Sequence, residues 1–147
     1  MTDEPDETRQ MGFLIHDVAR LLRREFDRRG KRTDATRAQY VALARIRNQE
    51  GLSQTELAAL MDIRPITLTR IIDRLVEKSW VERRAHPTDR RMWLLYLTPK
   101  ARPHTDKMRE VARDVRKKAF NGIPSQDLQK LRWMLEKVKD NLAQEER

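Results

Sequence analysis

The sequence predicts a mainly helical fold that contains one small two-stranded β-hairpin. Apolar residues recur at helical spacing through most of the 147 residues, as they do along amphipathic helices. Between residues 51 and 98, two short helices separated by a tight turn precede two strands and a basic loop. We expect a disordered tail over 1–9, a helix and linker over 10–35, the helix-and-hairpin unit over 36–98, and further helices over 99–147.

A helix with one apolar stripe is expected from about Gln10 to Arg29. The stripe has the spacing of a single helix face, and it consists of Met11, Leu14, Ile15, Val18, Leu21, Leu22 and Phe26. The polar residues before it predict the tail, and the short basic segment after it predicts the linker.

Two capping boxes predict where the next helices begin. Thr36 is followed at the third position by Gln39, and Ser53 is followed in the same way by Glu56. In a capping box the two side chains and two backbone N–H groups satisfy one another. We therefore expect one helix after Thr36 and a shorter one after Ser53, and we expect Ser125 to cap the last helix.

A four-residue turn over 61–64 separates the short third helix from a fourth, which begins with a proline in a favourable position. This spacing is typical of a helix-turn-helix. The N-terminal residues of a recognition helix face base edges, so short polar and basic side chains are expected there. The candidates for base or phosphate contacts are Arg64, Thr67, Thr69 and Arg70. The alternative is an ordinary amphipathic helix with a solvated basic face.

The hairpin carries arginines at its tip. Residues 81–85 and 92–97 have strand patterns, and the long loop between them contains Asp89, Arg90 and Arg91. Arginine on a projecting hairpin suits the narrow minor groove of DNA, where the negative potential is concentrated. We expect Asp89 to orient an arginine rather than to touch DNA. The alternative is a basic surface hairpin without a nucleic-acid role.

The C-terminal helix carries a long apolar seam. Its residues repeat at alternating spacings of three and four, which indicates packing against other helices over the whole length; they are Leu128, Leu131, Leu135, Val138 and Leu142. This seam and the N-terminal stripe are too apolar to remain in water. A twofold dimer would bury them and hold two recognition helices about 34 Å apart, whereas the alternative is packing within one chain.

The charge of the chain favours a polyanionic partner. Lys and Arg total 32 against 23 Asp and Glu, a formal net charge of +9, which favours nucleic acid first and an acidic membrane second. Cysteine is absent, which excludes disulfides and thiolate chemistry. We expect no metal, no cofactor and no enzymatic activity, because the three histidines are far apart and no phosphate loop or nucleophile motif is present. Without a long apolar run or a signal peptide, we expect a cytoplasmic protein without a membrane partner.

Several motifs in this order resemble the MarR family of winged-helix transcription regulators. They are GLSQTELA at 51–58, TRIIDRL at 69–75, VER at 81–83, DRR at 89–91 and LT at 97–98. The resemblance covers about residues 12–142 and is nearest to the SlyA-like branch. One departure is Ser79, where the family usually has glycine.

The resemblance implies a winged helix-turn-helix with N- and C-terminal dimerisation helices, forming a homodimer on palindromic double-stranded DNA. It implies that Arg91 enters the minor groove and that Ser53 and Gln54 lie where phosphates are contacted. The whole predicted DNA-binding set is Ser53, Gln54, Arg64, Pro65, Thr67, Thr69, Arg70, Arg74, Arg90 and Arg91, with Asp89 supporting the wing. The predicted dimerisation set is Leu14, Val18, Leu128, Leu131, Leu135 and Val138.

The resemblance also implies a repressor that leaves DNA when a small aromatic or phenolic anion, an acid or its thioester, binds beside the dimerisation helices. The candidate wall is Phe13, His16, Arg20 and Tyr40, with Arg23 nearby; the alternative is that these are core and solvated residues. A second reading of the whole chain is a nucleoid-associated, sequence-tolerant architectural DNA-binding protein without ligand control.

Overall fold

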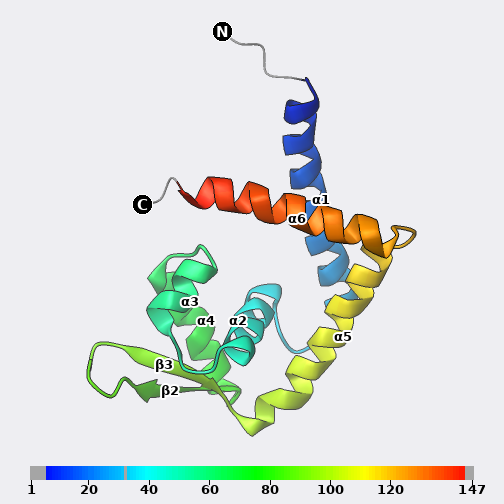
Figure 1. Cartoon of the computed structure of the whole chain (residues 1–147). Coiled ribbons are helices and arrows are strands. Elements are labelled where there is room, and N and C mark those ends of the chain that lie inside the picture. Colours follow the sequence, from blue (N-terminus) through cyan, green and yellow to red (C-terminus); the bar gives the residue numbers. More distant parts are fainter. Residues whose placement is uncertain (1–5, 32, 145–147) are drawn as a thin grey trace. The chain divides into compact units, whose positions relative to one another are not determined.

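Helices make up most of the residues that the computed structural model describes, which are 6–31 and 33–144. The chain divides into two units, 1–113 and 114–147, and each is described by itself. The first unit contains α1 (Asp6–Gly30), α2 (Arg37–Asn48), β1 (Leu52–Ser53), α3 (Gln54–Leu60), α4 (Pro65–Glu77), β2 (Val81–Ala85) and β3 (Trp93–Leu97) (Figure 1). A short 3₁₀ helix (Pro99–Ala101) leads into α5 (Arg102–Ala119), which crosses into the second unit, and α6 (Ser125–Ala143) follows. The predicted mainly helical fold with a small antiparallel sheet is confirmed.

Both predicted capping boxes are present. The Thr36 hydroxyl accepts a hydrogen bond from the Gln39 N–H, and the Gln39 side chain accepts one from the Thr36 N–H, both at 3.2 Å. At the start of α3 the Ser53 hydroxyl accepts from the Glu56 N–H at 3.1 Å, and the Glu56 carboxylate accepts from the Ser53 N–H at 2.9 Å. These bonds satisfy N–H groups that lack partners within the helix.

The bond from the Ser53 backbone N–H, followed by the interaction with the Ser53 side chain, lowers the pKa of Glu56 below its usual value. A lowered pKa in the folded state means that the charged carboxylate favours folding. This contribution is therefore complete above the ordinary glutamate pKa, and it is lost as the pH falls through the lowered pKa of the folded protein.

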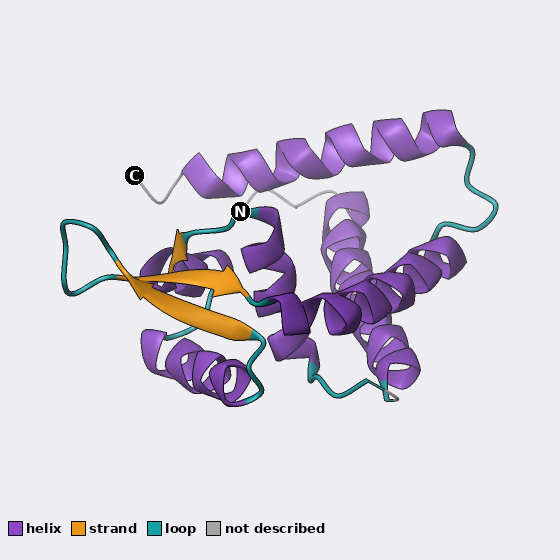
Figure 2. Ribbon diagram, turned by 90° about the horizontal axis from the view of Figure 1, so that it is seen from below, coloured by secondary structure: helices purple, strands orange, loops and turns teal. Residues whose placement is uncertain are grey.

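The core of the first unit lies where α2, α3 and α4 meet the small sheet (Figure 2). Fully buried side chains come from each helix and from the central strand, and they include Leu43, Ile46, Leu57, Leu68, Ile72, Leu75 and Leu95. Close packing of such aliphatic side chains supplies most of the stabilisation of a small domain. The core therefore fixes the positions of α3 and α4 relative to the hairpin.

The sheet has three strands in the order β1-β3-β2, all antiparallel. The sequence predicts only β2 and β3, because the two residues of β1 also form the start of a capping box. Gly51 precedes β1 with φ +81° and donates its N–H to the Leu95 carbonyl at 3.0 Å. A Cβ at this position would lie 2.9 Å from the Tyr96 hydroxyl oxygen. Glycine therefore suits this position because of its left-handed backbone conformation, and it leaves room for the Tyr96 hydroxyl group.

The structure differs from two local predictions and agrees with a third. Residues 6–9 are helical rather than part of a tail, because Asp6 and Glu7 are favourable at a helix N-terminus. The rest of the predicted tail, residues 1–5, lies outside the described residues. Ser125 does not cap α6, because it is the first helical residue and Pro124 stands at the cap without a side-chain bond. Ser79, which stands where the family usually has glycine, has φ 61°. A serine therefore adopts the left-handed conformation that glycine favours at this position.

Replacing Ser53 by Ala removes the side-chain acceptor at the start of α3, and it is expected to lower the free energy of unfolding by about 1 kcal/mol. Ser125→Ala is the matched control, because Ser125 is also at a helix start but makes no capping bond. Urea unfolding of both variants is the measurement. Equal stabilities for Ser53→Ala and Ser125→Ala would contradict the assigned role of Ser53.

Candidate nucleic-acid interface

The helix-turn-helix is formed by α3, the turn 61–64 and α4. The turn is held by bonds from the Asp62 N–H to the Ala59 carbonyl and from the Ile63 N–H to the Ala58 carbonyl, both at 3.1 Å. Asp62 has φ 50°, a left-handed conformation that Asp tolerates better than most residues. The chain thus reverses in a few residues, and α4 begins with Pro65 at its first position, as predicted.

The two sides of α4 differ sharply. Leu68, Ile72 and Leu75 are fully buried, and at 3.6 residues per turn the side opposite to them carries Ile66 and Arg70. The predicted contact residues Arg64, Pro65, Thr67, Arg70 and Arg74 are all exposed. Among the described residues, no hydrogen bond or ion pair engages the guanidinium groups of Arg64, Arg70 and Arg74. The exposed side of α4 and its N-cap residue Arg64 therefore offer cationic donors to an external acceptor.

A polar network joins α3, α4 and the hairpin. The Gln54 amide donates to the Thr69 hydroxyl at 2.8 Å, and that hydroxyl donates to the Pro65 carbonyl at 3.0 Å. Arg83 donates through Nε to Gln54 Oε1 at 3.2 Å and forms an ion pair with Asp73 at 2.6 Å. Gln54 and Thr69, both predicted to contact DNA, are thus engaged within the chain, where they fix α4 relative to β2.

Sequence reasoning missed Asp73 and Arg83 as members of this network. Their bonds join residues that are far apart in sequence, and no local pattern indicates which side chains will meet. One signal in the sequence is Asp73 itself, an acidic residue within the predicted recognition helix. Such a residue needs a cation nearby if the surface is to attract DNA.

The hairpin loop is ordered by its own side chains and projects beyond the sheet (Figure 2). The Asp89 carboxylate accepts from the Arg91 N–H at 3.0 Å and lies 3.5 Å from its Nε. The Arg91 side chain is 93% exposed, so Asp89 restricts it without covering it. The His86 ring nitrogen Nδ1 accepts from the Thr88 and Asp89 N–H groups, both at 3.2 Å. His86 thus shapes the loop, a role that no local sequence pattern indicates.

Ser53 requires a correction. The resemblance predicts that it contacts a phosphate, but the residue is only 1% exposed and its hydroxyl oxygen is occupied by the cap of α3. A buried hydroxyl cannot reach a phosphate outside the protein. Ser53 therefore fixes the start of α3 instead.

The five residues of the predicted ligand wall do not converge within one chain. Phe13, His16, Arg20 and Arg23 are exposed on α1, and Arg20 is paired with Asp17 at 3.3 Å. Tyr40 instead stacks on Phe26, with 4.9 Å between the ring centres. Thirteen helical residues, or about 20 Å, separate Phe26 from Phe13. Phe26 is thus the aromatic neighbour of Tyr40 that the prediction missed.

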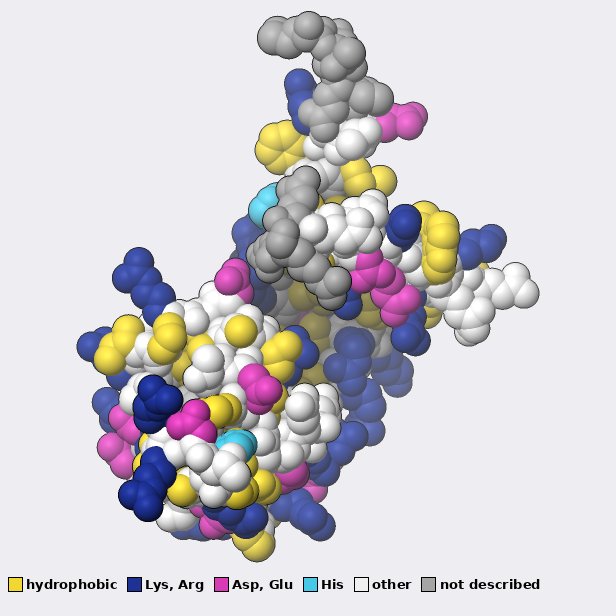
Figure 3. Space-filling view, turned by 60° about the vertical axis from the view of Figure 1, so that its left-hand side comes forward, with side chains coloured by type: hydrophobic (Ala, Val, Ile, Leu, Met, Phe, Trp, Pro, Cys, Tyr) yellow, Lys and Arg dark blue, Asp and Glu magenta, His cyan; other side chains and the backbone are white. Residues whose placement is uncertain are grey.

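The visible surface in Figure 3 shows many Lys and Arg side chains with hydrophobic side chains between them. This pattern agrees with the net charge of +9 and with nucleic-acid-binding surfaces in general. Within residues 6–31 and 33–144, no helix is long and apolar enough to cross a membrane. In the same part of the chain, no three His, Asp or Glu side chains gather in a way that would hold a metal ion.

Comparisons with known proteins agree with this geometry. The MarR family model matches residues 35–92. The crystal structure of wild-type MarR from E. coli in its apo form is 30% identical, with a TM-score of 0.75, and the match covers 86% of this chain and 95% of that one.

Two other structures are also similar. A mutant of E. coli MarR complexed with operator DNA is 29% identical over 93% of this chain and 99% of its own, with a TM-score of 0.78. A MarR-family transcriptional regulator from Rhodococcus sp. RHA1 is 25% identical over 89% and 93%, with a TM-score of 0.80. The chain therefore belongs to the MarR family, whose members are DNA-binding transcription regulators of the winged-helix fold and not enzymes.

Proposed function

We propose that this protein is a homodimeric repressor that binds a palindromic operator and leaves it when a small aromatic or phenolic anion binds. The observation that carries the DNA-binding part is the exposed Arg70 on the outward side of α4, whose guanidinium has no partner among the described residues. It is fixed relative to a hairpin whose tip exposes Arg91. The motifs of the sequence favour the SlyA-like branch, and the site of action would be chromosomal DNA in the cytoplasm.

In this proposal α4 enters the major groove and the hairpin reaches the adjacent minor groove. Direct contacts are assigned to the exposed members of the predicted set, which are Arg64, Pro65, Thr67, Arg70, Arg74, Arg90 and Arg91. Gln54 and Thr69 hold α4 in position through their mutual bond. The similarity to the operator-bound E. coli protein supports this arrangement.

Arg70→Ala and Arg91→Ala are expected to weaken binding to the operator by about ten- to a hundredfold each, because a well-placed arginine contact contributes about 1–3 kcal/mol. Arg132→Ala on α6 is the control, since that arginine is paired with Glu136 at 2.8 Å and lies outside the interface. The measurement is a titration of a duplex selected by the wild-type protein from a random library.

Unchanged binding by both arginine variants would contradict the assignment. Equal affinity of the wild-type protein for selected and random duplexes, with a steep dependence on salt, would instead favour the architectural alternative.

The dimer is proposed from the apolar side chains that a single chain leaves in water. Neither α1 nor α6 contains a buried residue, and both carry half-exposed apolar side chains: Met11, Phe13, Leu14, Ile15, Val18 and Leu21 on α1, and Met134, Leu135, Val138 and Leu142 on α6. Contiguous apolar surface of this kind marks an interaction site. A second copy offers the same two stripes, so a twofold dimer would cover all of them.

Leu135→Asp is expected to convert the dimer to a monomer, because it places a charge in the apolar seam of α6. Lys137→Asp changes the charge more strongly but lies on the polar side of the same helix, so that variant is expected to remain dimeric. Sedimentation velocity at micromolar concentration is the measurement. A monomeric wild-type protein, or a dimeric Leu135→Asp variant, would contradict the proposed interface.

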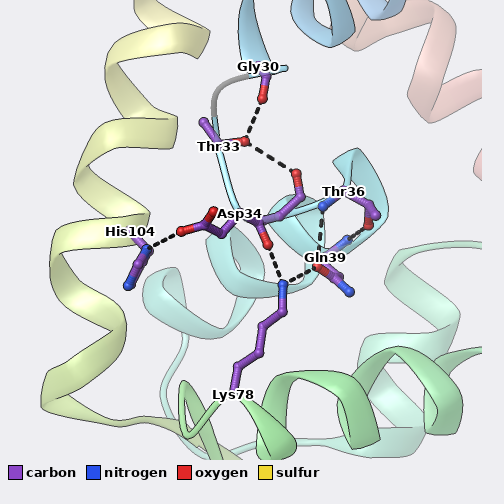
Figure 4. Close-up of polar contacts among 8 residues, drawn as sticks. Gly30, Thr33, Asp34, Thr36, Gln39, Lys78 and His104 are labelled. Carbon is purple, nitrogen blue, oxygen red and sulfur yellow. Dashed lines mark hydrogen bonds and ion pairs between the residues drawn. The ribbon is translucent and has the colours of Figure 1, made fainter.

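For the effector, the structure favours the junction of α1 and α2 (Figure 4). A groove there is lined by Phe26, Arg37, Arg74 and Lys78, among others. The Lys78 ammonium group, at the C-terminal end of α4, donates to the Asp34 carbonyl and to Gln39 Oε1. An aromatic carboxylate stacked near Phe26 would compete for Lys78 and displace the end of the recognition helix. A hundredfold loss of DNA affinity needs only about 2.8 kcal/mol of coupling.

Lys78→Met is expected to weaken the response to effectors at least tenfold. Aromatic acids and their thioesters would first be screened for loss of operator binding by the wild-type protein. Any compound that acts is expected to be at least tenfold less effective on Lys78→Met and unaltered on Lys100→Met, an exposed lysine outside the groove. If effectors act on Lys78→Met as strongly as on the wild-type protein, this groove is not the effector site.

A further inference from the structure

We infer that Ile66 reads sequence, by packing its side chain against the 5-methyl group of a thymine in the operator. This inference rests on the proposed function, because it assigns a specificity to the helix that is proposed to enter the major groove. The resemblance and the charge pattern draw attention to Pro65 and to the polar and basic residues of α4, and they leave Ile66 without a role.

Ile66 lies at the centre of the outward side of α4. Successive residues turn by about 100°, so Ile66 is nearly opposite to the fully buried Leu68, Ile72 and Leu75. It shares its side with Arg70, one helical turn further on. The residue is 60% exposed, so it contributes little to the core.

Local structure gives no reason for an isoleucine at this position. The second residue of a helix favours Asp or Glu, which complement the helix dipole, and β-branched side chains have a lower helix propensity than straight ones. An apolar side chain in this place costs free energy in water, which an apolar partner would recover. This apolar partner must belong to the molecule that the outward side of α4 contacts.

In the major groove that partner is the thymine methyl group. It is the one apolar group that base edges display there, and aliphatic side chains recognise it by contact. Apart from Pro65, the exposed residues nearest to Ile66 in sequence are the polar Arg64, Thr67 and Arg70, so the apolar surface at this position is small. Such an arrangement suits base readout better than docking of an apolar protein surface, which needs a larger patch.

The spacing along α4 restricts which thymine is involved. Ile66 and Arg70 are separated by about 6 Å along the helix axis, and successive base pairs are about 3.4 Å apart. The thymine is therefore expected within about two base pairs of the guanine that Arg70 contacts. It is expected once in each half of a palindromic operator.

The test replaces thymine by uracil, which removes only the methyl group. In the duplex that the wild-type protein selects from a random library, each thymine is changed to deoxyuridine in turn, in one half-site. We expect one position near the Arg70 guanine to weaken binding about fourfold, the effect of about one buried methyl-sized group. Ile66→Ala is expected to bind thymine and uracil equally at that position.

Leu60→Ala is the matched control, because Leu60 is another half-exposed aliphatic residue of the helix-turn-helix; this variant is expected to keep the fourfold effect. Ile66→Val is expected to keep most of it. Thermal unfolding of Ile66→Ala should match the wild type, as its side chain is largely exposed.

An unchanged uracil effect in Ile66→Ala would overturn the inference, as would a wild-type protein that selects an operator but is insensitive to every uracil. Failure of the wild-type protein to select any duplex is a different result. It would overturn the proposed function, and this inference with it.

Discussion

The burial of one side of α4 is the constraint on which the remainder of the structure depends. Leu68, Ile72 and Leu75 are completely enclosed by α2, α3 and the sheet, so the helix cannot rotate about its axis without exposing aliphatic surface. Each of these side chains contributes about 1.5–3 kcal/mol when fully buried. With the rotation fixed, the helical period alone decides that Ile66 and Arg70 point away from the core.

Polar bonds extend this constraint from the helix to the hairpin. Arg83 connects Gln54 on α3 with Asp73 on α4, and Asp89 restricts Arg91 at the hairpin tip. In both places an acidic side chain engages an arginine and lowers the local repulsion between cations. Arg70 and Arg74 of α4 form no ion pair among the described residues, so their charges can interact with an external partner. Rigid placement of such groups before binding reduces the entropy lost when a complex forms.

Much of this arrangement is predictable from sequence because it is local. A capping box, a proline at a first helical position and an alternating strand pattern each involve residues within a few positions of one another, and the starts of α2, α3 and α4 agree with them. Ser79 stands where the family usually has glycine, and it has the left-handed conformation that glycine favours. The outward position of Arg70 also follows, because a buried stripe and its opposite side are visible in the periodicity.

The missed features depend on contacts between distant residues. The strand β1 exists only because β3 lies beside it, and two residues carry no strand pattern of their own. The partner of Tyr40 is Phe26 rather than Phe13, a choice set by the geometry of the α1–α2 junction. Ser53 shows a third limit: the same serine suits a capping box and a phosphate contact, and only its burial decides between them.

In the proposed complex, α4 and the hairpin tip of each chain engage neighbouring grooves, so that the dimer does so twice on one duplex. Chemical footprinting of the wild-type protein on its selected duplex tests this most directly. Two protected major-groove segments about one helical turn apart are expected, each flanked on the outer side by a protected stretch of minor groove. Protection spread evenly along the duplex, or confined to a single major-groove segment, would contradict the proposed complex.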